Sequence, residues 1–89
     1  CEELTAFRAF RDGYLRACPD GEDLIREYYD IAPGIVTCIN LGSERRETYR
    51  AIRETWLAPC YEDLQNGRLA QCKDRYVDMV RTLEHRFLS

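Results

Sequence analysis

The stretch RLAQCKDRYVDMVRTLEHRFL, residues 68–88, decides the fold class of this chain. Apolar side chains recur in it at steps of three and four residues, which is the spacing of one face of an α-helix. These side chains are Leu69, Cys72, Tyr76, Val80, Leu83 and Phe87. The pattern predicts a long amphipathic helix whose apolar stripe packs against other helices.

Prolines and glycines divide the preceding sequence into further helices. Residues 2–18 form the first expected helix, because Pro19 disfavours helical backbone at the residue before it. Asp20 is a suitable N-cap for a second helix, which we expect to end at Pro33. The apolar run at 35–39 is the most strand-like stretch of the chain. It has no partner strand, so we expect a brief buried helix there.

A third helix is expected from Glu44 through Trp56. Pro59 lacks a backbone donor and should kink or break this helix, and Gly67 can adopt the left-handed conformation that ends a helix. We therefore predict an all-α fold, a compact bundle of four to five helices whose third helix is broken near Pro59. Residues 1–89 are expected to form a single helical domain, either whole or as a fragment of a larger protein.

The composition is that of a soluble, folded protein. Hydrophobic residues make up 45% of the chain and charged residues 33%, and the formal net charge is −3. No apolar run approaches the ~20 residues of a membrane span, and no signal peptide is visible. We therefore expect no membrane partner and a cytoplasmic location. The net negative charge also makes nucleic acid an unfavourable partner.

One cation falls on an apolar stripe of the first expected helix. The positions that share this stripe at helical spacing are Leu4, Phe7, Arg11, Tyr14 and Cys18. A guanidinium in an apolar seam is costly unless it meets a carboxylate or several carbonyls. We therefore expect Arg11 to be mostly buried and paired with an acidic side chain, or with carbonyls of the second helix or of the turn at Pro33.

Two adjacent tyrosines complete the candidate site. Neighbouring side chains on a helix point about 100° apart, so one ring should enter the core and the other should lie at its edge. A tyrosine hydroxyl and the Arg11 guanidinium could share a carboxylate, such as that of Asp12 or Asp30. We predict a buried polar cluster that clamps the first two helices, with a ligand site as the alternative. Its members are Arg11, Asp12, Tyr28, Tyr29 and Asp30.

The five cysteines carry no metal or redox signature. No two lie within four residues of each other, so the close paired spacing of zinc ribbons is absent. We expect buried free thiols, while disulfides or a metal site remain alternatives. His85, the only histidine, is expected at the surface. We predict no catalytic residue, no metal and no cofactor, and name Cys1 as the candidate reactive thiol.

A series of short motifs resembles a known family. Phe10-Arg11-Asp12-x-Tyr14-Leu15, Pro19-x-Gly21, Tyr28-Tyr29 and Pro33-x-Ile35 follow one another in the order found in the bacterial CFI-box C-terminal domain. The resemblance covers about residues 7–40, and the Cys-Phe-Ile box that names the family is absent. It implies a domain that ends larger bacterial proteins, with no established activity to carry over.

These observations favour a small soluble helical domain that serves as a binding or accessory module of a bacterial protein. Its expected partner is another protein or a second copy of the chain, which would need a contiguous apolar surface. The alternative is a thiol-dependent enzyme or modifying domain that uses Cys1 or an upstream cysteine. That alternative requires a thiol with a depressed pKa and fast alkylation.

Overall fold

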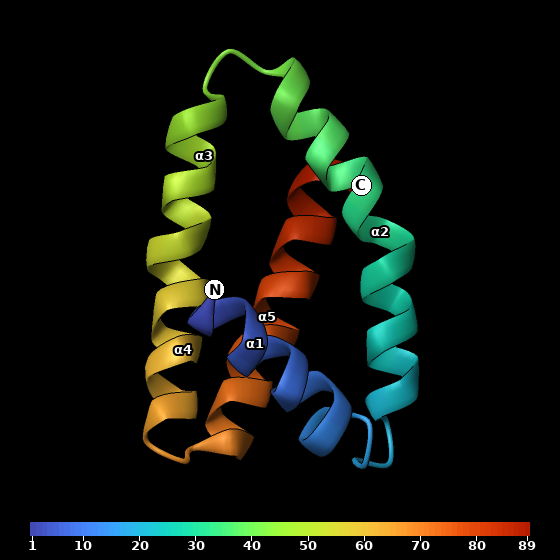
Figure 1. Ribbon diagram of the computed structural model, residues 1–89. Helices are drawn as coiled ribbons and strands as arrows, with labels where there is room; N and C mark the ends of the chain where they lie inside the picture. Colours follow the sequence, from blue (N-terminus) through green and yellow to red (C-terminus); the bar gives the residue numbers. More distant parts are fainter.

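The computed structural model describes all 89 residues and contains helices only (Figure 1). The α-helices are α1 Glu2–Ala9, α2 Gly21–Leu41, α3 Arg45–Ile52, α4 Ala58–Gln65 and α5 Leu69–Leu88. Two π-helical segments, η1 Phe10–Leu15 and η2 Arg53–Leu57, continue α1 and join α3 to α4. The chain therefore forms four rods, and the all-α prediction is confirmed.

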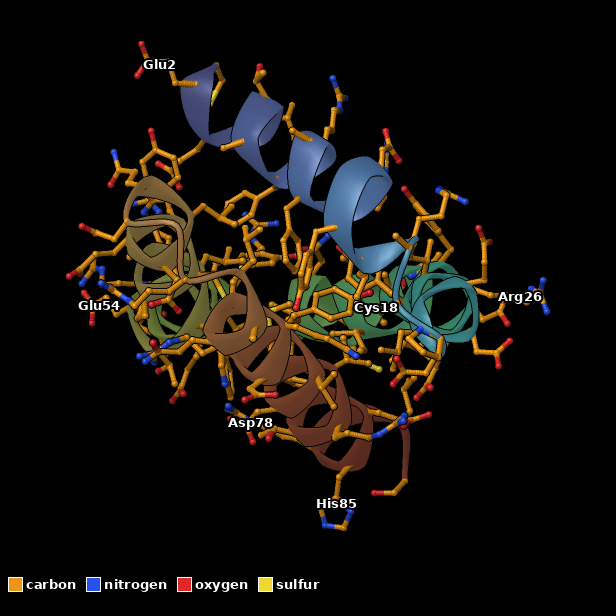
Figure 2. The ribbon with its side chains drawn as sticks, turned by 90° about the horizontal axis from the view of Figure 1, so that it is seen from below. Glu2, Cys18, Arg26, Glu54, Asp78 and His85 are labelled. Carbon is orange, nitrogen blue, oxygen red and sulfur yellow. The ribbon has the colours of Figure 1, made fainter.

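The four rods enclose a core that α1 covers only in part. In Figure 1 the α3–η2–α4 rod and α2 stand on either side of α5, and the α1–η1 rod crosses in front of their lower half. The view from below shows α1 and α5 on opposite sides of the layer that contains α2 and α3–η2–α4 (Figure 2). The upper part of the face opposite α5 consequently has no helix over it.

The π-helical turn η1 shifts the apolar face of the first rod. The wider turn brings Phe10 and Leu15, five residues apart, to the core, and both are buried. The N–H of Arg16 donates to the carbonyl of Arg11 at 2.9 Å, which is an i to i−5 bond. Arg11 thereby moves off the core-facing stripe, and its side chain is 32% exposed. Arg11 is therefore half-buried, and the prediction that it is mostly buried, which assumed α-helical spacing throughout, is met only in part.

The second helix does not end at Pro33. α2 continues through this proline to Leu41, so the run at 35–39 belongs to the same helix. Pro33 is exposed, so the carbonyl that it leaves without a donor can be hydrated. Figure 1 shows α2 bending toward α3 beyond its middle. At the bend Gly34 lies against Leu88, whose Cδ2 is only 3.3 Å from the position of an added Cβ. Tertiary packing therefore overrides the local stop signal.

The third helix is interrupted just before Pro59, where the sequence predicted a break. The interruption is the π-helical segment η2, and the rod continues through α4. A proline cannot donate to the carbonyl four residues earlier, and a wider turn directly before it accommodates that loss. The result is one long rod with an altered turn near its centre.

Two glycines permit the tight turns. A Cβ on Gly21 would lie 1.6 Å from the carbonyl oxygen of Leu15, so the start of α2 can approach the end of η1 only with glycine there. Gly67 has φ of 70°, the left-handed conformation predicted for it. Asp20 occupies the N-cap position as predicted, but its carboxylate accepts a bond from Lys73 Nζ of α5 at 2.8 Å.

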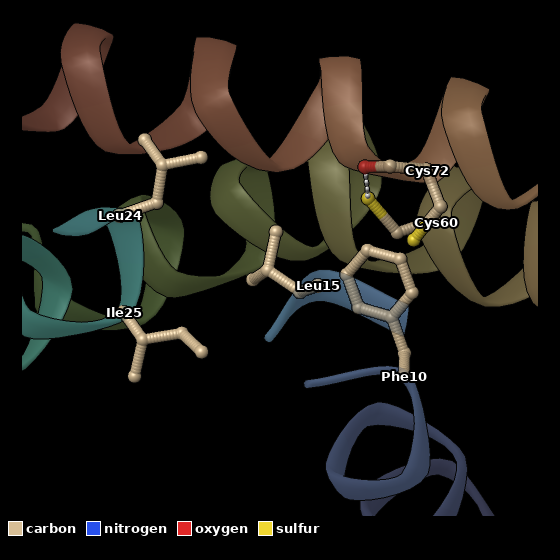
Figure 3. Packing of buried hydrophobic residues seen from close by; sticks show 6 residues of the cluster. All are labelled: Phe10, Leu15, Leu24, Ile25, Cys60 and Cys72. Carbon is tan, nitrogen blue, oxygen red and sulfur yellow. Dashed lines mark hydrogen bonds between the residues drawn. The ribbon is translucent and has the colours of Figure 1, made fainter. Parts of the chain in front are cut away.

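The core consists of two apolar clusters along α5. The first lies where η1, α2, α4 and α5 meet (Figure 3) and contains Phe10, Leu15, Leu24, Ile25, Cys60 and Cys72. The second lies between α2, α3 and α5 and contains Ile35, Ile39, Ile52, Met79, Val80 and Leu83. The apolar stripe predicted for the last helix contributes to both clusters, although Leu69 is 37% exposed.

A buried carboxylate fastens α4 to α5. Asp63 is only 1% exposed, and its two oxygens accept bonds from Arg68 Nε at 3.0 Å and Arg75 Nε at 2.8 Å. Its backbone carbonyl accepts a third bond, from the N–H of Arg68 at 2.8 Å. The charge is therefore fully paired where it leaves water, which is the condition for burying a carboxylate.

We expect Asp63→Ala to destabilise the fold by about 2–3 kcal/mol, because it removes two charge-assisted hydrogen bonds from a buried position. The two arginines are 42% and 38% exposed and regain water, which keeps the loss below that of a fully buried pair. Urea unfolding measures the change. Glu62→Ala is the matched control, since Glu62 is 71% exposed; equal losses in the two variants would show that Asp63 has no special role.

Candidate functional site

Arg11 links the first rod to α2. Its Nη1 donates to the hydroxyl of Tyr29 at 2.6 Å, and its Nε and Nη2 donate to the two oxygens of Asp12 at 2.8 and 3.1 Å. The predicted contact between Arg11 and an acidic side chain is therefore present, and that carboxylate belongs to its own helix. The hydrogen bonds to Asp12 raise the pKa of Arg11 above its ordinary value and lower that of Asp12.

The cluster extends along the surface and not into the core. Asp12 also contacts Arg16 Nη2 at 3.4 Å, and Arg16 Nη1 donates to Glu22 at 2.9 Å. Asp30 is exposed and takes no part in these bonds, so its predicted membership is wrong. The expected burial of one tyrosine is also wrong, because Tyr28 is 37% and Tyr29 53% exposed. The cluster therefore joins the α1–η1 rod to α2 through contacts that are exposed to solvent.

Tyr28 remains accessible because a cavity lies beside it. The cavity, about 370 Å³ in volume, separates α1 from the first core cluster, and we call it the α1 pocket. Twelve of its fourteen lining residues are hydrophobic, among them Phe7, Tyr28 and Met79, and the other two are Arg8 and Arg11. The pocket therefore has an apolar interior with two cations and no carboxylate in its lining.

Two thiols and a tyrosine hydroxyl also line the α1 pocket. Cys60 Sγ lies 3.8 Å from the carbonyl oxygen of Cys72, and both side chains are buried, as the sequence predicted (Figure 3). The hydrogen bond to Cys60 and burial raise the pKa of Cys72, so its thiol keeps its proton. Tyr76 donates to the carbonyl of Leu24 at 3.3 Å, and burial raises its pKa.

A second hollow, the α2–α3 groove, continues upward from the α1 pocket. Its volume is about 190 Å³ and every lining residue is hydrophobic, with Val36 of α2 and Ile52 of α3 on its walls and Leu83 of α5 on its floor. Tyr49 closes the upper end by donating its hydroxyl to Asn40 Oδ1 at 2.9 Å. The groove and the pocket share Tyr28, Leu57 and Met79.

A basic stripe borders the α2–α3 groove along the rod of α3. Arg46, Arg50 and Arg53 follow one another at steps of four and three residues, so they share one flank of the helix. Arg53 donates from Nη1 and Nη2 to the two oxygens of Glu3 in α1, at 3.1 and 2.7 Å. This flank therefore faces the side on which α1 lies. Arg46 and Arg50 are exposed and form no ion pair.

The remaining thiols do not assemble a nucleophile. All five cysteines are free; Cys1 and Cys38 are exposed, and Cys18 is half-buried. Cys1 is the neighbour of Glu2, which lies on the opposite side of the molecule from His85 in Figure 2. The only imidazole of the chain is consequently out of reach of Cys1 as a general base.

No family model, curated protein or solved structure matches the chain, so the geometry alone carries the functional argument. None of the helices combines the length and the apolar character that crossing a bilayer requires. The resemblance of residues 7–40 to the CFI-box domain stays a prediction. The sequence marked residues 45–53 as a mildly basic segment, but neither of the two hollows was found from it.

The contact between Arg11 and Tyr29 can be tested with a double-mutant cycle. We expect Arg11→Met and Tyr29→Phe each to lower stability slightly, and the double variant to lose less than the sum, because both changes remove the same bond. Thermal unfolding measures all four proteins. Additive losses would show that the two side chains are not coupled.

Acid should loosen α1 from the basic stripe. The hydrogen bond from Arg53 holds the pKa of Glu3 below its ordinary value of 4.5. A lowered folded-state pKa stabilises the docked helix above the unfolded value, and this contribution is lost as the pH falls through the folded value. NMR titration of the Glu3 carboxyl should show a midpoint below 4.5 that rises toward 4.5 in Arg53→Gln. Identical midpoints in both proteins would contradict the contact.

Proposed function

We propose that this chain is a binding module that recognises an acidic amphipathic helix of a partner protein in the α2–α3 groove. The observation that carries the proposal is the combination of an uncovered apolar groove with a basic stripe along one rim, in which Arg46 and Arg50 form no ion pair. A helix that buries one apolar stripe in a groove and sets its charges against the rim is a recurring mode of peptide recognition.

Within the chain itself, α1 already pairs an acidic side chain with the basic stripe beside the groove. α1 is an amphipathic helix on the same face, and it places Phe7 near Tyr61 of α4, with ring centroids 6.2 Å apart. Its Glu3 pairs with Arg53, the last residue of the basic stripe. Arg46 and Arg50 continue the stripe beyond α1, so a second acidic helix would find the same type of partner there.

A second copy of the chain fits this surface less well. A two-fold contact through the groove would bring Arg46 and Arg50 close to the same residues of the other copy. Like charges at such a distance oppose association. The lining of the groove includes Val36 of α2 and no carboxylate that would compensate these arginines. The charge pattern therefore favours a different, acidic protein.

The thiol-dependent alternative has less support. The hydrogen bond with Cys72 lowers the pKa of Cys60, but Cys60 and Cys72 are only 4% and 1% exposed, and Cys1 lacks an imidazole within reach. Placement of the chain in the CFI-box family is part of our proposal, since that family implies an accessory domain of a larger bacterial protein. The resemblance rests on residues 7–40, which include the wall of the groove formed by α2.

The groove can be tested with two designed helical peptides of identical apolar pattern, one carrying Glu and the other Lys along one flank. We expect the Glu peptide to bind at least about tenfold more tightly in titration calorimetry, because only it complements the stripe. Arg46→Glu/Arg50→Glu should abolish this preference. Chemical-shift changes should centre on Val36, Tyr49 and Ile52.

The matched control is Arg26→Glu/Arg86→Glu, which changes the net charge equally at positions outside the groove. It should leave the preference for the Glu peptide almost unchanged. Loss of the preference in both double variants would show that the preference for the Glu peptide depends only on net charge. Absence of binding by either peptide, or sedimentation showing a dimer that buries Val36, would overturn the proposal.

A further inference from the structure

The α1 pocket has features of a small-molecule site that the helix-binding proposal does not use. Its volume of about 370 Å³ falls within the range of ligand pockets, and it lies under α1 and not in the uncovered groove. None of the residues of α1 itself is buried. Phe7 of α1 is only half-buried against the first core cluster, and the helix covers the pocket while leaving part of its apolar lining accessible.

The charges at the pocket are all of one sign. Arg8 and Arg11 are its only charged lining residues, and no carboxylate lines it. Arg11 is already neutralised by the two oxygens of Asp12, whereas Arg8 is exposed and forms no ion pair. The free cation at the pocket is thus Arg8, one helical turn before Arg11. An anion there would be attracted without competition from an internal partner.

The lining of the pocket interior determines the chemistry of the part of the ligand that is buried. Phe10 and Leu15 of η1, Ile25 of α2 and the two thiols of Cys60 and Cys72 form an apolar floor. The hydroxyl of Tyr76 is engaged with Leu24, and that of Tyr29 with Arg11. Few polar groups inside the pocket remain to be satisfied, so the buried part of a ligand must be hydrocarbon.

We propose that the α1 pocket binds a small amphiphilic carboxylate, with its hydrocarbon chain against the first core cluster and its carboxylate at Arg8 beside the Arg11–Tyr29 bond. A monocarboxylate with a medium-length alkyl chain has both parts. The pocket shares Tyr28, Leu57 and Met79 with the groove but differs from it in its cation, because Arg8 lines only the pocket.

The test compares decanoate, decanol and decylamine, which share a chain and differ in the charge of the head group. Titration calorimetry with each monomer on the full chain should show decanoate binding about tenfold more tightly than decanol, and decylamine most weakly. Met79, the only methionine, lines both the pocket and the groove, so its labelled methyl signal in NMR spectra reports a ligand in either hollow. Shifts of Phe10 and Cys72, which line only the pocket, assign the ligand to it.

Arg8→Gln should weaken decanoate about tenfold and leave decanol unchanged, because only the head-group contact is lost. Arg26→Gln, a matched change outside the pocket, should alter neither. Equal binding of the three ligands, an unaffected Arg8→Gln variant or an unmoved Met79 signal would overturn the proposal. So would binding to phosphatidylglycerol vesicles with none to monomeric decanoate, since a membrane surface would then be the ligand.

Discussion

The buried carboxylate of Asp63 is the interaction on which the arrangement of helices depends. It fixes α4 against α5 through Arg68 and Arg75, on either side of the tight turn at Gly67. α5 in turn carries both apolar clusters, so its position determines where α2 and the first rod can pack. The pocket and the groove are the spaces that this frame leaves.

Charged contacts then set the first rod and α2 against the frame. Asp20 meets Lys73, Glu27 meets Arg81, and Glu3 meets Arg53 across elements distant in sequence. Exposed pairs of this type contribute little stability each. Their main effect is to favour one helix arrangement over others with similar apolar contacts, because a helix that is rotated or shifted by one turn would lose these ion pairs. The same preference for paired charges makes the unpaired arginines informative about function.

The sequence was sufficient for the fold class and most helix positions, because apolar periodicity depends on burial in any context. It failed where the backbone departs from α-helical geometry. A π-helical turn places Arg11 at the edge of the core, and α2 continues through Pro33 with Gly34 packed against Leu88. Asp63 was missed. Like Arg11, it is a charged residue at helical spacing on an apolar stripe, since it lies three residues after Cys60. The α1 pocket and the α2–α3 groove depend on the spacing between rods, and the residue pattern of a single helix does not predict that spacing.

The hairpin of α4 and α5 also has a consequence for the order of folding. Its ionic contacts join residues only five and twelve positions apart, so little chain entropy is lost in forming them. Contacts of α1 with the third rod span fifty residues. The α4–α5 hairpin therefore closes much shorter loops than the contact of α1 with Arg53, and this favours its earlier formation.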